Sequence, residues 1–218
     1  MTTFKDHLAV VHCPKSHDEL QVEDAESGEI LAIRKTKEME FHSRLAMSSN
    51  ERYLLSAGWF WHPLHGLWAS DLVDGAEGYS YSFGAEVDSA AFLGDDRIVV
   101  TTTDEMVDDQ IPRDGLAPMQ LGVWSIAQSR WLSTVALSEF SGMIMPWRDW
   151  IISFYGHPKA IEASTGQIVQ KWNDINSGRQ VGAINLGTPP PPPIALDPKG
   201  GRFAVGGPEG ITVISLSA

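Results

Sequence analysis

Two parts of the chain decide its fold: SSNERYLLSAGW at residues 48–59 with GLWASDL at 66–72, and LDPKGGRFAVGGPEGITVISL at 196–216. In both, a polar turn leads into a short apolar strand rich in small and β-branched residues, and a second apolar strand follows. The first of these strands recurs along the chain as DHLAVVH from Asp6, RYLLSAG from Arg52, RIVVTTT from Arg97, DWIISFYG from Asp149 and RFAVGG from Arg202. The spacings between these copies are 46, 45, 52 and 53 residues.

The repeat unit is predicted to contain four strands. A strand such as SRLAMSS or SAAFLGDD precedes most copies, and a hairpin such as LQVEDAESGEI followed by ILAIR comes after them. Four-stranded propeller blades take about 40–45 residues. We therefore expect one all-β domain over residues 1–218, a β-propeller of about five four-stranded blades. An irregular sandwich or an orthogonal barrel is the alternative.

The segments 48–72 and 196–216 resemble blades of WD40-type propellers and of the related irregular propellers of bacteria. The resemblance extends over nearly the whole chain and rests on the polar turn, the apolar strand ending in small residues, and the next strand ending near a "WD-L" position. No GH dipeptide opens a blade and no WD dipeptide closes one. The resemblance implies a repeat protein of the WD40-like class.

Closure of the ring is open at this point. The first repeat has no obvious first strand and the last has no fourth. The terminal blades could be three-stranded, MTTFK could supply an edge strand, or another chain could complete a larger propeller. An exposed blade edge invites pairing with another strand, so we expect some closure or partner.

The charge balance constrains the partners. The chain has 16 basic and 28 acidic residues, a net charge of −12. Clustered Lys and Arg, which nucleic-acid binding requires, are missing, so we expect no nucleic-acid partner. One cysteine, Cys13, no signal-peptide pattern and no run of about 18 apolar residues lead us to expect a cytoplasmic protein that does not span a membrane.

The long loops are predicted to gather on one face. In a propeller the loops from second to third strand (B–C) and from blade to blade (D–A) share a face, where function usually lies. The B–C loops here carry aromatic and acidic residues, which suit a protein interface with a basic partner. We predict the contact residues Trp59, Phe60, Trp61, His62, His65, Asp104, Glu105, Asp108 and Asp109.

Metal binding is a weaker possibility. His62 and His65 form an H-x-x-H pair for which His17 or His157 could be a third zinc ligand, but a Pro-containing loop does not hold the rings as a helix would. We expect no metal ion and no cofactor. The prolines at 189–193 are expected to form a stiff spacer, with binding to an SH3- or WW-like domain as the alternative.

No catalytic signature is present: the nucleophile elbow, P-loop, dinucleotide fingerprint and H-E-x-x-H motifs are all absent. We therefore expect a non-catalytic protein-binding propeller, including the narrower option of an acidic inhibitor or immunity-type protein. The alternative is a glycan-binding or glycoside-hydrolysing propeller with carboxylates at a central channel, for which Asp71, Asp88 and Glu162 are candidates.

Overall fold

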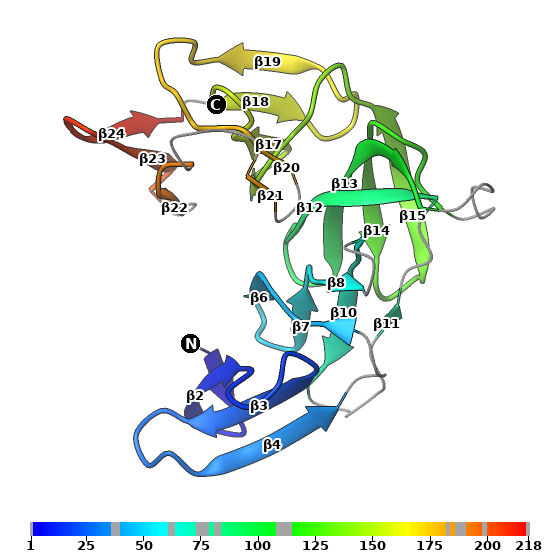
Figure 1. Cartoon of the computed structure of the whole chain (residues 1–218), viewed down its shortest axis with the longest axis vertical. Helices are drawn as coiled ribbons and strands as arrows, with labels where there is room; N and C mark the ends of the chain where they lie inside the picture. The colour runs from blue at the N-terminus through cyan, green and yellow to red at the C-terminus, as the bar shows by residue number, and fades with distance from the viewer. Residues whose placement is uncertain are drawn as a thin grey trace.

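A computed structural model describes residues 2–35, 40–60, 64–72, 79–80, 84–107, 115–181, 184–185, 191–197 and 200–216. Within these ranges every helix or strand element is a β-strand. Five antiparallel sheets, which we call blades I to V, follow one another along an open arc (Figure 1). The N-terminal blade stands at one end of the arc and the C-terminal blade at the other, as the repeat predicted for an all-β propeller architecture.

Four blades contain four strands each, and their strands pair in sequence order. Blade I contains β1 (Thr2–Phe4), β2 (His7–His12), β3 (Glu19–Asp24) and β4 (Ile30–Lys35). Blade II contains β6 (Leu45–Met47), β7 (Tyr53–Ser56), β10 (Trp68–Asp71) and β11 (Tyr79–Ser80). Blade III contains β12 (Ala85–Phe92), β13 (Arg97–Met106), β14 (Gln120–Ser125) and β15 (Arg130–Ala136). Blade IV contains β16 (Ile144–Trp147), β17 (Trp150–Ser153), β18 (Lys159–Glu162) and β19 (Ile168–Lys171).

Blade V has three strands among the described residues: β22 (Ile194–Asp197), β23 (Arg202–Gly207) and β24 (Gly210–Ser215). A short hairpin, β20 (Gln180–Val181) with β21 (Ile184–Asn185), precedes it. The five recurring apolar segments are the second strands of the five blades. At the other terminus, β1 pairs with β2, so the N-terminal residues supply the first strand of blade I. For blade I, the prediction that MTTFK supplies an edge strand is therefore correct.

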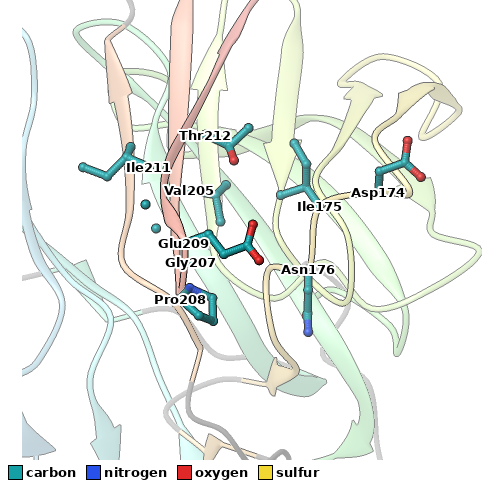
Figure 2. Close-up of a pocket in the computed structure, with 11 residues that line it drawn as sticks. Asp174, Ile175, Asn176, Val205, Gly207, Pro208, Glu209, Ile211 and Thr212 are labelled. Carbon is teal, nitrogen blue, oxygen red and sulfur yellow. The ribbon is translucent and has the colours of Figure 1, made fainter.

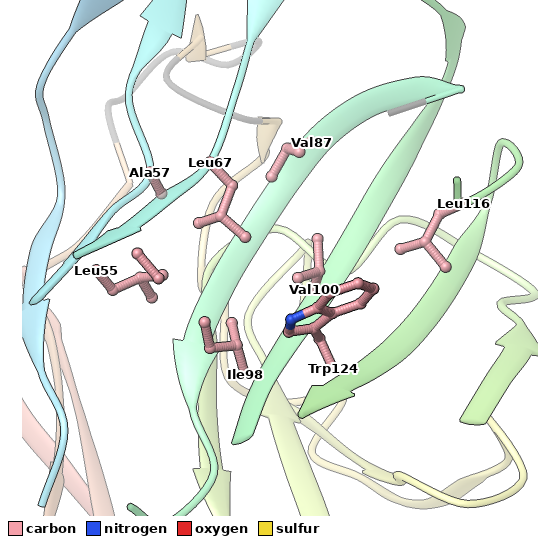
Figure 3. Close-up of a cluster of buried hydrophobic side chains, with 9 residues drawn as sticks. Leu55, Ala57, Leu67, Val87, Ile98, Val100, Leu116 and Trp124 are labelled. Atoms are coloured by element: carbon pink, nitrogen blue, oxygen red, sulfur yellow. The ribbon is translucent and has the colours of Figure 1, made fainter. Parts of the chain in front are cut away.

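Four hydrophobic clusters lie between successive blades. The cluster between blades II and III brings Leu55 and Leu67 against Ile98, Val100 and Trp124 (Figure 3). The other three join blades I and II, III and IV, and IV and V in the same way. Successive side chains of a strand point to opposite faces, so a middle strand can serve two clusters. In β13, Ile98 and Val100 belong to one cluster and Val99 to the next.

Blade II has an extension that the sequence did not reveal. Residues expected to form a B–C loop form part of a small sheet of β5 (Glu40–Phe41), β8 (Trp59–Phe60) and β9 (Leu64–His65). Gly58 permits this arrangement, because a Cβ added there would lie 1.8 Å from the carbonyl oxygen of Phe41. The segment before blade II can therefore run directly against the end of β7.

Candidate functional site

The described B–C and D–A segments of blades I and II meet at one end of the molecule. The backbone N–H of His42, before blade II, donates to the carbonyl of His17 in the first B–C loop at 2.8 Å. This bond joins the blade I loop to the small sheet β5–β8–β9. The predicted gathering of loops is thus present for these two blades.

Aromatic residues form a row across the small sheet. The register pairs Phe41 with Trp59, and Trp59 with His65. Directly paired residues of antiparallel strands share one face, so these three side chains stand in line. The rings of Phe41 and Trp59 are stacked, with centroids 4.1 Å apart and planes 13° apart. His17 extends the row, its ring centroid 6.1 Å from that of Phe41.

A buried hydrogen-bonded pair fixes the inner end of this aromatic row. His65 Nδ1 lies 2.7 Å from Glu86 Oε1 at the start of β12, and both side chains are buried. The hydroxyl of Thr103, on β13, donates to the other carboxylate oxygen of Glu86 at 3.3 Å. Burial by itself raises the pKa of Glu86, but the hydrogen bonds and charge of His65 and the Thr103 bond outweigh it and lower that pKa. The carboxylate thus connects blade II to blade III in its ionised form.

Exposed acidic residues continue directly from Thr103. Asp104 and Glu105 are exposed at the end of β13, and the Glu105 N–H donates to the Thr103 hydroxyl at 3.1 Å. Met106 and Val107 come next, 42% and 36% exposed. An aromatic row, two carboxylates and two apolar side chains therefore lie along one connected series of contacts. We call this set, Phe41, Trp59 and Asp104–Val107, the loop-end surface.

The nine predicted contact residues divide into four groups. Trp59 is half-buried and Asp104 and Glu105 are exposed, in accord with a surface role. His65 is buried at the inner end of the aromatic row, where its ring is hydrogen-bonded to Glu86, so it supports the row and is not an exposed contact residue. Phe60 is described only as a strand residue paired with Glu40 and Leu64. The other four, Trp61, His62, Asp108 and Asp109, lie outside the described residues.

Three members of this site were missed from the sequence: His17 as a ring contact, Phe41 and Glu86. Phe41 lies in a segment between blades with no periodic pattern. Glu86 is 21 residues from His65, and only the packing of blade II on blade III brings them together. The only local signal was the acidic residue on a buried strand, in GAEVDSAAF.

The possible zinc ligands are not assembled in the described part. There, no group of three or more His, Cys, Asp or Glu side chains has an arrangement that could hold a metal ion. The Nδ1 atom of His65 is occupied by Glu86, and His157 Nδ1 donates to the carbonyl of Ile175 at 2.9 Å. His62 lies outside the described residues.

The three candidate carboxylates of the glycan hypothesis each make a structural contact. Asp71 forms an ion pair with Arg52 at 2.7 Å. Asp88, which is buried, accepts from the hydroxyl of Ser141 at 2.9 Å and from the backbone N–H of Gly142 at 2.9 Å, and so joins blade III to blade IV. Glu162 accepts from the Thr165 hydroxyl in a turn. These contacts tie the carboxylates to strands and turns.

A buried histidine, just before the first strand of blade II, packs against the two middle strands of that blade. His42 shares a 2.9 Å hydrogen bond with Ser56 and packs edge-on against Trp68, at 6.1 Å between ring centroids. Burial lowers the pKa of His42 to about 4, although the charge of Asp18 acts in the opposite direction. The ring is therefore neutral near pH 7.

The described part of the chain contains no helix long and apolar enough to cross a membrane. No protein-family model matches the sequence, and no curated protein matches it. Among solved structures it is similar to the WD40 domain of Neurospora crassa Pan2, with a TM-score of 0.61 and 13% sequence identity. The match covers 94% of this chain and 57% of that one. The fold is thus WD40-like, and the chain corresponds to little more than half the length of that structure.

Proposed function

We propose that this chain is a non-catalytic protein-binding module and that its partner contacts the loop-end surface. The observation that carries the proposal is the stacked pair of rings, Phe41 on Trp59, with the buried His65–Glu86 pair at the inner end of the same row. Rigid aromatic side chains next to carboxylates have the composition of interface hot spots. A site preorganised by buried contacts loses little conformational entropy on binding.

We further propose that the partner is basic. The chain carries a net charge of −12, and Asp104 and Glu105 are exposed at the end of β13, which the Thr103–Glu86–His65 contacts connect to the aromatic row. A negative surface accelerates encounter with a positive one and makes the rate depend on salt. If the partner is a basic enzyme, occlusion of its site would make this chain an inhibitor or an immunity-type protein. Trp61, Asp108 and Asp109 remain part of the predicted contact set.

The test compares two charge reversals in the same blade. The variant Asp104→Lys/Glu105→Lys alters the loop end of β13, whereas Asp95→Lys/Asp96→Lys alters the turn at its opposite end, with the same change of net charge. Proteins captured from native lysate by the wild-type chain are identified, and the binding of each purified candidate is then measured by calorimetry at low and high salt.

We expect Asp104→Lys/Glu105→Lys, and separately Trp59→Ala, to weaken the binding at least tenfold, while the opposite-end control binds like the wild type. Equal losses in both charge variants would reduce the effect to net charge and refute the choice of surface. An association rate that does not change with ionic strength would refute the basic partner.

The glycan alternative has less support, since Asp71, Asp88 and Glu162 each make structural contacts. The glycan hypothesis predicts binding on a glycan array and release of reducing sugar, whereas the proposed function predicts neither.

A further inference from the structure

The last described strand of blade V, β24, is much more exposed than the third strands of blades I, III and IV. The third strands β3, β14 and β18 are mostly buried, because a fourth strand and neighbouring blades cover them. In β24 five of six residues are exposed, among them Ile211 at 75% and Val213 at 56%. Ile211, Thr212 and Ile175 line a hollow of about 420 Å³ beside the β23–β24 hairpin, and Figure 2 shows the side chain of Ile211 on the other side of the hairpin from that of Thr212. The side chains of Ile211 and Val213 are therefore largely exposed, whereas Ile214 packs on the cluster with blade IV.

Among the described residues, the backbone of β24 is paired along one edge only. It pairs with β23 on one side and with no described strand on the other. The N–H of Leu216 donates to the carbonyl of Gly201 at 2.6 Å, toward β23. Backbone groups alternate in direction along a strand, so those of Ile214 and Thr212 also face β23. The N–H and C=O groups of Ile211 and Val213 face the open edge.

The outer edges of other blades carry features that discourage pairing with another chain. The outer strands β4, β15 and β19 contain Arg34, Arg130 and Lys171 respectively, and each ladder has a shifted register typical of a bulge. Charges and bulges are the usual protection of edge strands. The strand β24, with sequence GITVIS, has no charge, no proline and no register shift, and four of its residues are Ile, Val or Thr.

We propose that β24 is a self-association site, at which the same strand of a second copy of this chain pairs antiparallel along the open edge. In the register that places apolar residues together, Ile211 of each copy lies opposite Val213 of the other. The two blades V then form one continuous six-stranded sheet. Ile211 and Val213 of each strand then form backbone N–H to C=O hydrogen bonds with Val213 and Ile211 of the other.

The chemistry of the edge favours a second copy as the occupant. An acidic chain that recognised a basic partner here would need carboxylates along the strand, and β24 has none. In the proposed register Glu209 lies opposite the uncharged Ser215, so no like charges face each other despite the net charge of −12 on each copy. Recognition by backbone groups and paired Ile and Val side chains is self-complementary.

The first test is the mass in solution by sedimentation equilibrium, with two proline variants. Proline is tolerated on an edge strand where the replaced N–H faces solvent. Val213→Pro removes an N–H of the open edge without touching the bonds to β23. Thr134→Pro is the matched control on the outer strand β15. The N–H of Leu137 donates to the carbonyl of Met119 at 2.8 Å, toward β14. Because backbone groups alternate in direction along a strand, the N–H of Thr134 faces the outer edge.

We expect the wild-type chain and Thr134→Pro to sediment at twice 23.9 kDa and Val213→Pro at 23.9 kDa, each with an unchanged circular dichroism spectrum. A wild-type monomer at about 100 µM, where an interface of micromolar Kd is occupied, would overturn the proposal. So would a dimer that both variants retain, or one that both lose, since its contact would then lie elsewhere.

A second measurement does not depend on how a variant folds. Amide hydrogen exchange of the wild-type chain is followed at low and at high protein concentration. We expect exchange at Ile211 and Val213 to slow with concentration, while Thr212 and Ile214 are protected at both. Concentration-independent exchange at Ile211 and Val213 would refute pairing at this edge.

Discussion

Replacing His42 by Asn should remove a specific acid sensitivity of the fold. The histidine ring is 8% exposed, hydrogen-bonded to Ser56 and packed on Trp68. The Asn side-chain amide can occupy the position of Nδ1 and keep a bond to Ser56, but it does not titrate. The variant therefore separates the protonation of His42 from its packing.

The expected magnitude follows from the pKa of His42. Burial lowers it from the ordinary 6.5 to about 4. Below about pH 6.5 the unfolded chain binds a proton that the folded chain does not bind until about pH 4, so the free energy of unfolding falls as the pH falls through this window. One pKa unit corresponds to about 1.4 kcal/mol, which gives a loss of about 2.5 kcal/mol between about pH 7 and pH 4.5.

The assay is urea unfolding of the wild type and His42→Asn at several pH values over this range. At about pH 7 the variant should be less stable by roughly 1 kcal/mol, because the packing on Trp68 is altered. At about pH 4.5 the order should reverse, since only the wild type has lost the His42 contribution. The carboxylates of Glu86 and Glu139, whose pKa values are lowered in the fold, lose their stabilising effect at lower pH in both proteins and cancel in the difference.

The control is His17→Asn, which changes an exposed histidine. Its stability should fall with acidification in parallel with the wild type. If wild type and His42→Asn lose stability in parallel between about pH 7 and pH 4.5, His42 is not a buried neutral group and the reasoning is refuted.

Two further tests, each with a control substitution, address packing and charge. Gly58→Ala places a Cβ 1.8 Å from a carbonyl oxygen of β5 and should lower the free energy of unfolding in urea by roughly 3 kcal/mol. The control Gly207→Ala, whose added Cβ has its nearest contact at 3.7 Å, should change it by no more than about 0.5 kcal/mol, and similar losses in both variants would contradict the close approach of β5. Glu139→Gln should lower the free energy of unfolding by roughly 3 kcal/mol, because the ammonium group of the buried Lys159, 3.0 Å from the Glu139 carboxylate, loses its counter-charge. The control Lys171→Gln, at the partly exposed end of the same cluster, should change it by less than about 1 kcal/mol. A larger loss for Lys171→Gln than for Glu139→Gln would refute this assignment.

The repeat predicts the blades well because their strands are local. Each second strand, such as RYLLSAG, is a short β-branched segment between turns, and it becomes the middle of a sheet whatever lies further along the chain. The same reasoning fails for β8 and β9. Their residues were expected to belong to a loop, and the pairing of β8 with β5, from another part of the chain, makes them part of a sheet.

The site shows the same limit. His65 looks like an exposed loop residue, because it lies between Pro63 and Gly66 in a stretch that was predicted as a B–C loop. Its burial depends on Glu86 in the next blade, and that contact is a property of how two sheets pack. Asp104 and Glu105 are exposed, but they extend strand β13 beyond the buried run Ile98–Thr103 where a loop was expected, and their role as partner contacts stays a prediction.

The two proposed surfaces depend on different parts of the fold. The loop-end surface needs two blades at once, because Trp59 comes from blade II and Asp104 from blade III, and the His65–Glu86 pair connects these blades. His17 of blade I supports it through its ring contact with Phe41. The edge of β24 needs only its own sheet, where β23 and the cluster with blade IV fix its position. A change at Glu86 should therefore reshape the loop end and leave the edge intact, and a change at Val213 should do the reverse. Because the contacts of the two surfaces do not overlap, a dimer joined at β24 would carry two loop-end surfaces, which is the condition for bivalent attachment to a partner with repeated sites.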